Sequence, residues 1–305
     1  MGLASNKELL LLTTLRTFKI IAVIAVLAIV ASSHESVHAQ RREAHAETRH
    51  FEAGEELYFE AEFSRALLRK LDVADLKFRA TRTPLADSNG AKSEEAKPYA
   101  LTLSADVSSK GFFARLFNLK FRERVESTVE PVSFTVQRTT ILDEQGKRVR
   151  TTESTFDRSK GKMTWTLRDP NNPSAEPRQA ITDFSGQLQD VLSAIYFIRT
   201  LPLEVGKSFE VFVGDGGRVY RTPVKVVEKK RMKTILGRVD VLRVNPELFG
   251  PERLIDDEKG EFSIWITDDV RHIPVGGRVK TDYGIFEIKL KQIIINREAS
   301  PNKSK

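Results

Sequence analysis

The stretch ELYFEAEF, residues 56–63, alternates apolar and polar side chains with a period of two. All its apolar residues would lie on one face of a β-strand, and its polar residues, three of them glutamate, on the other. A strand of this kind buries one face only, which is typical of an antiparallel sheet that has one face in water. The sequence therefore favours such a sheet at its start.

The same alternation returns near the end of the chain, in FEIKLK at residues 286–291. The phase is lost at Gln292, which predicts a β-bulge or the end of one-sided burial there. Residues that tolerate positive φ separate the apolar runs, at residues 143–146, 157–161, 214–217 and 283–284. Many short strands at hairpin spacing indicate an antiparallel sheet.

One segment, DFSGQLQDVLSAIYFIRTLP at residues 183–202, has helical periodicity instead. Its apolar residues recur at helical spacing, Asp183 or Ser185 can cap the start, and Pro202 follows the end; these apolar residues are Leu188, Val191, Leu192, Ile195 and Ile198. The predicted fold is mainly β, a curved antiparallel sheet or half-barrel wrapped around one central α-helix.

The composition excludes several kinds of chemistry. The chain has 305 residues, 40% of them hydrophobic and 30% charged, and it contains no cysteine. Disulfides, thiolate nucleophiles and Cys-containing metal sites are therefore absent. His272 is the one histidine beyond the first 50 residues, so a His-rich metal site has no second imidazole. We expect neither a metal nor a cofactor.

The N-terminus has the pattern of a secretory signal peptide. Basic residues precede an apolar run from Ile20 to Ala31, and small and polar residues follow it up to Ala39. We predict a signal peptide at 1–39 with cleavage after about Ala39, a flexible leader at 40–50, a single β-rich domain at 51–296 and a disordered tail at 297–305. An N-terminal membrane anchor is the alternative. In both cases the protein is exported, to the periplasm.

The net charge of +7 limits the classes of partner that the protein is expected to bind. A basic exported protein is suited to anionic membrane surfaces, and nucleic acid is not expected in that compartment. The run Lys229–Lys233 is interpreted as a charged hairpin tip, with contact to anionic lipid headgroups as the alternative.

The segment TDDVRHIP, residues 267–274, gathers two aspartates, an arginine and the histidine. A catalytic cluster needs such groups to converge in a pocket, whereas here the alternation of Ile264, Trp265 and Ile266 indicates a strand that ends at Thr267. Short aspartate side chains then bond local amides in a turn. We predict a hairpin turn. A carboxylate-based hydrolase would need other pairs, Glu123 with Glu126 or Glu60 with Glu62.

Several segments together resemble a bacterial exported family known as domain of unknown function 3108. They are RVESTVEP at 124–131, the helix and following strands at 190–226, TILGRVDVLRVNPEL at 234–248, FSIWITDDVRHIPV at 262–275 and YGIFEIKL at 283–290. The chain departs from the family pattern at Ile235 and at Arg271-His272. The resemblance implies no active site, since the family has none assigned. A more distant likeness to periplasmic lipoprotein-carrier half-barrels is an analogy of fold.

From these observations we predict an exported, non-enzymatic binding module for an amphipathic ligand or partner of the cell envelope. A lipid, a lipoprotein or an anionic membrane surface would be the partner. A carboxylate-based hydrolase and a purely structural envelope protein are the alternatives. The predicted lining of the ligand site is Phe113, Phe117, Trp165, Tyr196, Phe197 and Trp265, with Arg124 and Arg271 at its rim. In KGFFARLFNLKF at residues 110–121, core packing of the phenylalanines is favoured over a lid at the cleft entrance, because most of the 18 phenylalanines must be buried.

Overall fold

The computed structural model describes residues 53–84, 99–110, 120–257 and 259–296. The predicted signal peptide, leader and tail lie outside these residues, as do Phe113 and Phe117. The described strands form one 15-stranded sheet in the order β8-β7-β6-β5-β4-β3-β2-β1-β15-β14-β13-β12-β11-β10-β9. The elements are β1 Glu55–Arg65, β2 Leu68–Pro84, β3 Tyr99–Ser109, β4 Phe121–Glu130, β5 Thr135–Gln145, β6 Arg148–Asp157, β7 Lys162–Arg168, β8 Arg178–Asp183, β9 Leu188–Gln189, α3 Val191–Arg199, β10 Ser208–Asp215, β11 Arg218–Thr234, β12 Gly237–Pro246, β13 Gly260–Thr267, β14 Pro274–Thr281 and β15 Gly284–Ile295.

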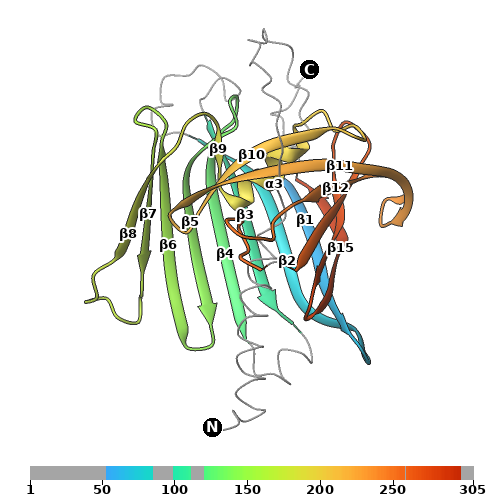
Figure 1. Cartoon of the computed structure of the whole chain (residues 1–305), viewed down its shortest axis with the longest axis horizontal. Helices are drawn as coiled ribbons and strands as arrows, with labels where there is room; N and C mark the ends of the chain where they lie inside the picture. The colour runs from blue at the N-terminus through green and yellow to red at the C-terminus, as the bar shows by residue number, and fades with distance from the viewer. Residues whose placement is uncertain (1–52, 85–98, 111–119, 258, 297–305) are drawn as a thin grey trace, which may run out of the picture.

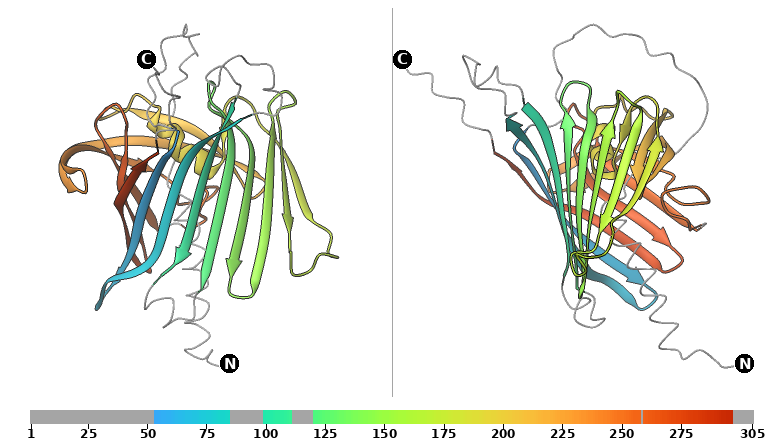
Figure 2. Two further views of the ribbon diagram at one scale, coloured as in Figure 1. Left: turned by 180° about the vertical axis from the view of Figure 1, so that it is seen from behind. Right: turned by 90° about the vertical axis from the view of Figure 1, so that its left-hand side faces the viewer.

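The sheet is strongly curved around its single described helix. The long strands β2 to β6 stand side by side as one wall, and β10, β11 and β12 cross this wall near one end, with α3 held beside them (Figure 1). Seen from the side, the green strands of the wall and the blue and red strands run in different directions, which shows the curvature of the sheet (Figure 2). The predicted fold, a curved antiparallel sheet around one helix, is confirmed; only the short β9 pairs in parallel, with β10.

The alternation in the sequence sets which side chains face the helix. On β1, Leu57, Phe59 and Phe63 are buried, while the intervening glutamates face outward and pair with lysines of neighbouring strands. Strand β1 pairs with β15, and the register shifts where Tyr58 is opposite Gln292 and Phe59 is opposite Leu290. The extra residue on β15 is the predicted bulge.

Helix α3 begins later than the sequence predicts. Asp190 is its N-cap, and the carboxylate accepts a hydrogen bond from the Ser193 amide at 2.8 Å. Thr139 on β5 donates to the other oxygen of the same carboxylate at 2.6 Å. Leu188, predicted to be on the helix, lies in β9 because that segment pairs with β10. In the described part of the chain, no helix has the length and apolar character needed to span a membrane.

The hairpin of β10 and β11 packs against the inner face of the opposite end of the sheet. The Thr182 hydroxyl on β8 donates to the Gly217 carbonyl at 2.6 Å. A β-carbon at Gly214 would lie 2.5 Å from the Met163 sulfur, so a side chain at this position of β10 would force Met163 on β7 to move. The two ends of the sheet therefore meet around the helix.

Candidate functional site

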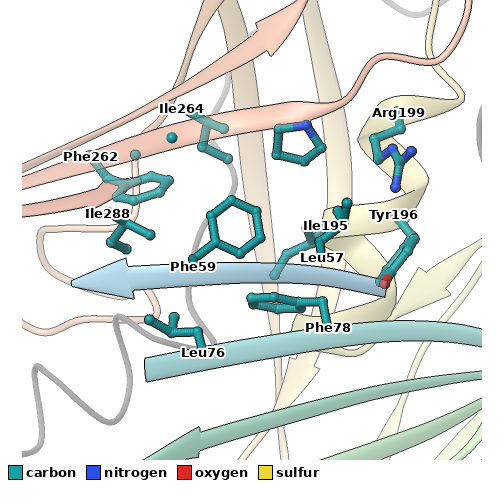
Figure 3. Close-up of a pocket in the computed structure, with 13 residues that line it drawn as sticks. Leu57, Phe59, Leu76, Phe78, Ile195, Tyr196, Arg199, Phe262, Ile264 and Ile288 are labelled. Atoms are coloured by element: carbon teal, nitrogen blue, oxygen red, sulfur yellow. The ribbon is translucent and has the colours of Figure 1, made fainter. Parts of the chain in front are cut away.

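An apolar cleft lies between α3 and the inner face of the sheet (Figure 3). It brings together β1 and β2 from the start of the chain with β13, β14 and β15 from its end. Its free volume is about 560 Å³ when the open mouth is included, and about 60 Å³ of it admits the centre of a water-sized sphere. The lining residues are Leu57, Phe59, Leu76, Phe78, Ile195, Tyr196, Arg199, Phe262, Ile264, Pro274, Gly276, Gly277 and Ile288. The cleft is therefore apolar and narrow.

Of the two glycines on β14, Gly277 faces the cleft opposite Ile264 and Ile288, whereas Gly276 is paired with Trp265 and Lys289 and contributes only backbone. A β-carbon at Gly276 would lie 2.7 Å from the Ile288 carbonyl oxygen, so this position excludes any side chain. A β-carbon at Gly277 would lie 3.5 Å from the Ser263 carbonyl oxygen and 3.6 Å from the Phe262 ring, which are ordinary contacts. Opposite them, the rings of Phe59 and Phe78 pack edge to face with centroids 5.6 Å apart. Gly277 is thus an open position in an otherwise filled wall.

A buried ion pair closes the end of the cleft beside the helix. The Arg199 guanidinium donates to both oxygens of the Glu55 carboxylate, at 2.6 and 3.0 Å, and the two residues are 0% and 3% exposed. Arg199 also donates to the Arg271 carbonyl at 3.2 Å, and its guanidinium lies 5.5 Å from the centroid of the Tyr196 ring. The charge of Arg199 is therefore neutralised inside the protein.

The segment TDDVRHIP forms the predicted turn. One carboxylate oxygen of Asp269 accepts hydrogen bonds from the Thr267 hydroxyl at 2.8 Å and the Arg271 amide at 3.0 Å. Burial raises the pKa of Asp269, but these hydrogen bonds outweigh it and hold the pKa below its usual value. The His272 Nδ1 donates to the Arg199 carbonyl at 2.7 Å. The turn therefore fastens the end of α3 to the sheet.

A second pocket, here named the acidic pocket, lies between α3, β4 to β7 and the end of β10. It is lined in part by Glu123, Asp190, Asp215 and Trp165. Burial and then the charges of Asp143 and Asp215 raise the pKa of Glu123 to about 8. Burial also raises the pKa of Asp190 and of Asp215. Within residues 53–84, 99–110, 120–257 and 259–296, no group of three or more histidine or acidic side chains has the geometry to hold a metal ion.

The aromatic residues predicted to line one site are distributed over several places. Tyr196 lines the apolar cleft, and Trp165 lines the acidic pocket. Phe197 packs on Phe134, with ring centroids 6.1 Å apart, and lines neither. Trp265 lies on the outer face beside Lys230 and Arg278, 4.8 and 5.9 Å from its ring centroid, because it alternates with the inward-facing Ile264 and Ile266.

The two predicted rim arginines also lie away from the cleft lining. Arg124 is exposed on β4, 3.5 Å from the Asp106 carboxylate. The exposed Arg271 side chain reaches Asp269 at 3.4 Å, and only its carbonyl contacts Arg199. The cationic residue that lines the cleft is Arg199, which the sequence reasoning did not select. The signal was present, because Arg199 lies four residues after Ile195 and seven after Leu192, on the apolar stripe of the helix.

The carboxylate pairs considered for a hydrolase do not converge. Glu123 faces the acidic pocket, whereas Glu126 is three residues further along the same strand and points to the outer face. Glu60 pairs with Lys110 and Lys291, and Glu62 pairs with Lys289, all on the outer face of the sheet. The acidic group with the strongly raised pKa, Glu123, instead shares its pocket with residues from other elements.

Comparison with known proteins gives a family and a similar structure. The family model described as "Protein of unknown function (DUF3108)" matches residues 89–291, which is more than half of the chain. A crystal structure of a "Beta-barrel-like Protein of Domain of Unknown Function DUF1849" from Brucella abortus is similar with a TM-score of 0.45 and 9% identity, over 79% of this chain and 97% of that one. Among curated proteins, none matches the sequence.

Proposed function

The chain belongs to the DUF3108 family, and we propose that this member is a non-enzymatic binding module that holds one uncharged apolar chain, such as the acyl tail of an envelope lipid or lipoprotein, in the cleft beside α3. The observation that carries the proposal is the lining of that cleft, which is almost entirely apolar and comes from five neighbouring strands and one helix. Ligand sites in proteins commonly have about 300–1,000 Å³, whereas only about 60 Å³ of this cleft admits a water-sized sphere, so the cleft has to widen when a ligand enters.

The state of Arg199 supports an uncharged ligand group inside the cleft. Its guanidinium is already bound through two hydrogen bonds to Glu55. An anionic head that displaced Glu55 would leave that carboxylate buried without a partner, which costs about 3–5 kcal/mol. The charged head of an amphipathic ligand would therefore stay at the mouth, in water. Arg124 and Arg271 do not line the cleft, and their side chains lie beside Asp106 and Asp269.

The driving force would be the hydrophobic effect, at about 0.8 kcal/mol for each methylene group removed from water. Because only about 60 Å³ of the cleft admits a water-sized sphere, a chain has to displace side chains or move α3 away from the sheet as it enters. Part of the gain is spent on that movement, so we expect moderate affinity.

The experiment uses Gly277, where a side chain fills the cleft without striking the backbone. Binding of cis-parinaric acid and of its methyl ester is followed by fluorescence. We expect the wild type to bind both alike, and Gly277→Leu to weaken both about tenfold or more, because overpacking costs about 1–3 kcal/mol.

Lys280→Leu is the matched control, since it adds the same side chain to the exposed face of the same strand. It should bind both probes like the wild type. A wild-type protein that takes up neither probe would contradict the proposal and favour a purely structural role. Equal binding by wild type and Gly277→Leu would place the ligand elsewhere.

We also propose that the protein is exported to the periplasm. The basic residues before Ile20, the apolar run to Ala31 and the small residues up to Ala39 support this. N-terminal sequencing of the isolated protein should find Gln40 as its first residue. A chain that keeps its first 39 residues in the membrane fraction would contradict cleavage and support the membrane-anchor alternative.

A further inference from the structure

The turn between β1 and β2 carries an exposed apolar group surrounded by positive charge. We name residues Arg65 to Lys70 the leucine tip. Leu67 is 98% exposed and Leu68 is 45% exposed. Arg65, Arg69 and Lys70 flank them and are also exposed. Single exposed apolar residues are common, but two adjacent leucines at a strand turn, with three cationic neighbours, form an amphipathic feature.

The leucine tip has a defined conformation. Arg65 pairs with Leu68, so the turn itself consists of Ala66 and Leu67. Ala66 and Lys70 have φ of 47° and 54°, in the left-handed region that favours glycine. The Lys70 amide donates to the Ser64 hydroxyl at 3.0 Å. The surrounding hairpin therefore holds two non-glycine residues in an unfavourable conformation, and Leu67 projects into solvent as a result.

The charges of the tip are only partly balanced by the protein: Lys70, after Arg278 and Lys289, helps to lower the pKa of Glu287. Among the described residues, Arg65, Arg69 and Lys70 form no ion pair, although most cations on the outer face of β1 and its neighbours do. Lys110 and Lys291 bind Glu60, for example, and Lys289 binds Glu62. Three positive charges are thus available to an external anion.

We propose that the leucine tip inserts into the surface of an anionic phospholipid membrane. Leu67 and Leu68 would enter the boundary between headgroups and acyl chains, and the three cationic side chains would lie at the level of the phosphates. A membrane fits this surface better than a protein does, because a stable protein interface needs about 800 Å² from each partner and two leucines on a narrow convex tip supply much less.

The tip and the cleft belong to the same pair of strands. Strand β1 lines the cleft with Leu57 and Phe59 and continues to Arg65, while β2 leaves the tip and returns to line the cleft with Leu76 and Phe78 (Figure 3). A membrane-bound tip would therefore attach the two strands to the lipid surface, with Phe59 of the cleft eight residues, about 26 Å, along the chain from Leu67. Membrane insertion of the leucine tip does not require a ligand in the cleft, because it depends on the exposed end of the hairpin.

The test measures binding to vesicles, by co-sedimentation of the purified exported protein. Phosphatidylcholine vesicles are compared with vesicles that also contain phosphatidylglycerol. We expect binding to the anionic vesicles that falls with added salt. The double variant Leu67→Ser/Leu68→Ser should bind about tenfold or more weakly. The triple variant Arg65→Gln/Arg69→Gln/Lys70→Gln should lose the preference for phosphatidylglycerol.

Val132→Ser is the matched control, because Val132 is 82% exposed at the turn between β4 and β5, next to the acidic Glu130. It should leave vesicle binding unchanged. Absence of wild-type binding to anionic vesicles, or equal binding by the double variant, would overturn the proposal. A loss of self-association in the double variant would also overturn it, since the tip would then bind a second copy. Gly277→Leu should bind vesicles like the wild type, so this variant distinguishes a failure of the cleft proposal from a failure of the membrane proposal.

Discussion

Arg199 determines the chemistry of the closed end of the cleft. Its partner Glu55 lies 144 residues away, and both side chains are buried, so either one alone would be an uncompensated charge inside the protein. The sequence shows only that a charged residue interrupts the apolar stripe of the helix. No local pattern identifies Glu55 as its partner, because that pairing depends on how β1 and α3 meet.

Removal of one partner should therefore be much more harmful than removal of both. We expect Arg199→Met to lower the free energy of unfolding by about 3–5 kcal/mol, and Arg199→Met/Glu55→Leu to recover most of that loss. Urea unfolding followed by circular dichroism measures both. Lys289→Met, which breaks the half-exposed pair with Glu62, should cost about 1 kcal/mol or less. If the double variant is as unstable as the single one, the pair stabilises the fold by more than the neutralisation of two buried charges.

The alternation of apolar and polar residues predicts a strand correctly where one face of that strand is buried. Strands β1 and β15, the bulge between them and the turn after β13 follow from alternation and turn chemistry. The start of α3 could not be predicted, because Asp183, Ser185 and Asp190 are all suitable caps. The pairing of Leu188 with β10 selects Asp190. The prediction that Trp265 lines the site is wrong, because its position between Ile264 and Ile266 assigns it to the outer face.

The acidic pocket depends on three elements and gives a pH-dependent stability. Strand β4 supplies Glu123, β5 supplies Asp143 and the end of β10 supplies Asp215; burial, followed by the other two charges, raises the pKa of Glu123 from 4.5 to about 8. Between these values the unfolded chain releases the proton and the folded chain keeps it. The contribution of Glu123 is therefore fully present below about pH 4.5 and is lost as the pH rises to about 8, by at most about 1.4 kcal/mol per pH unit.

Glu123→Gln should remove this dependence. Relative to the wild type, the variant should gain stability between pH 5 and pH 8 in urea unfolding. Glu126→Gln, on the outer face of the same strand, serves as the control and should follow the wild type. If Glu123→Gln and the wild type lose stability in parallel over this range, Glu123 ionises normally in the folded protein.

Across the molecule, the sheet order explains why the residues that line the cleft could not be grouped together from the sequence. Strand β1 lies between β2 and β15, so the first and last described strands are neighbours, and the cleft joins their side chains with those of α3. The fold class follows from periodicity, whereas the cleft follows from long-range pairings. Besides Arg199 on the apolar stripe of the helix, the glycine pair on β14 was a local sign, since glycine inside a strand often marks a close approach.

The proposed function requires that an apolar chain occupies the cleft beside α3. Its most direct test is photo-crosslinking with a fatty acid that carries a diazirine on its chain, followed by mass spectrometry of the labelled peptides. We predict labels on the residues of β1, β13, β14 and α3 that line the cleft, and loss of these labels in Gly277→Leu. Labels on the acidic pocket around Trp165, or unchanged labelling of Gly277→Leu, would contradict the claim.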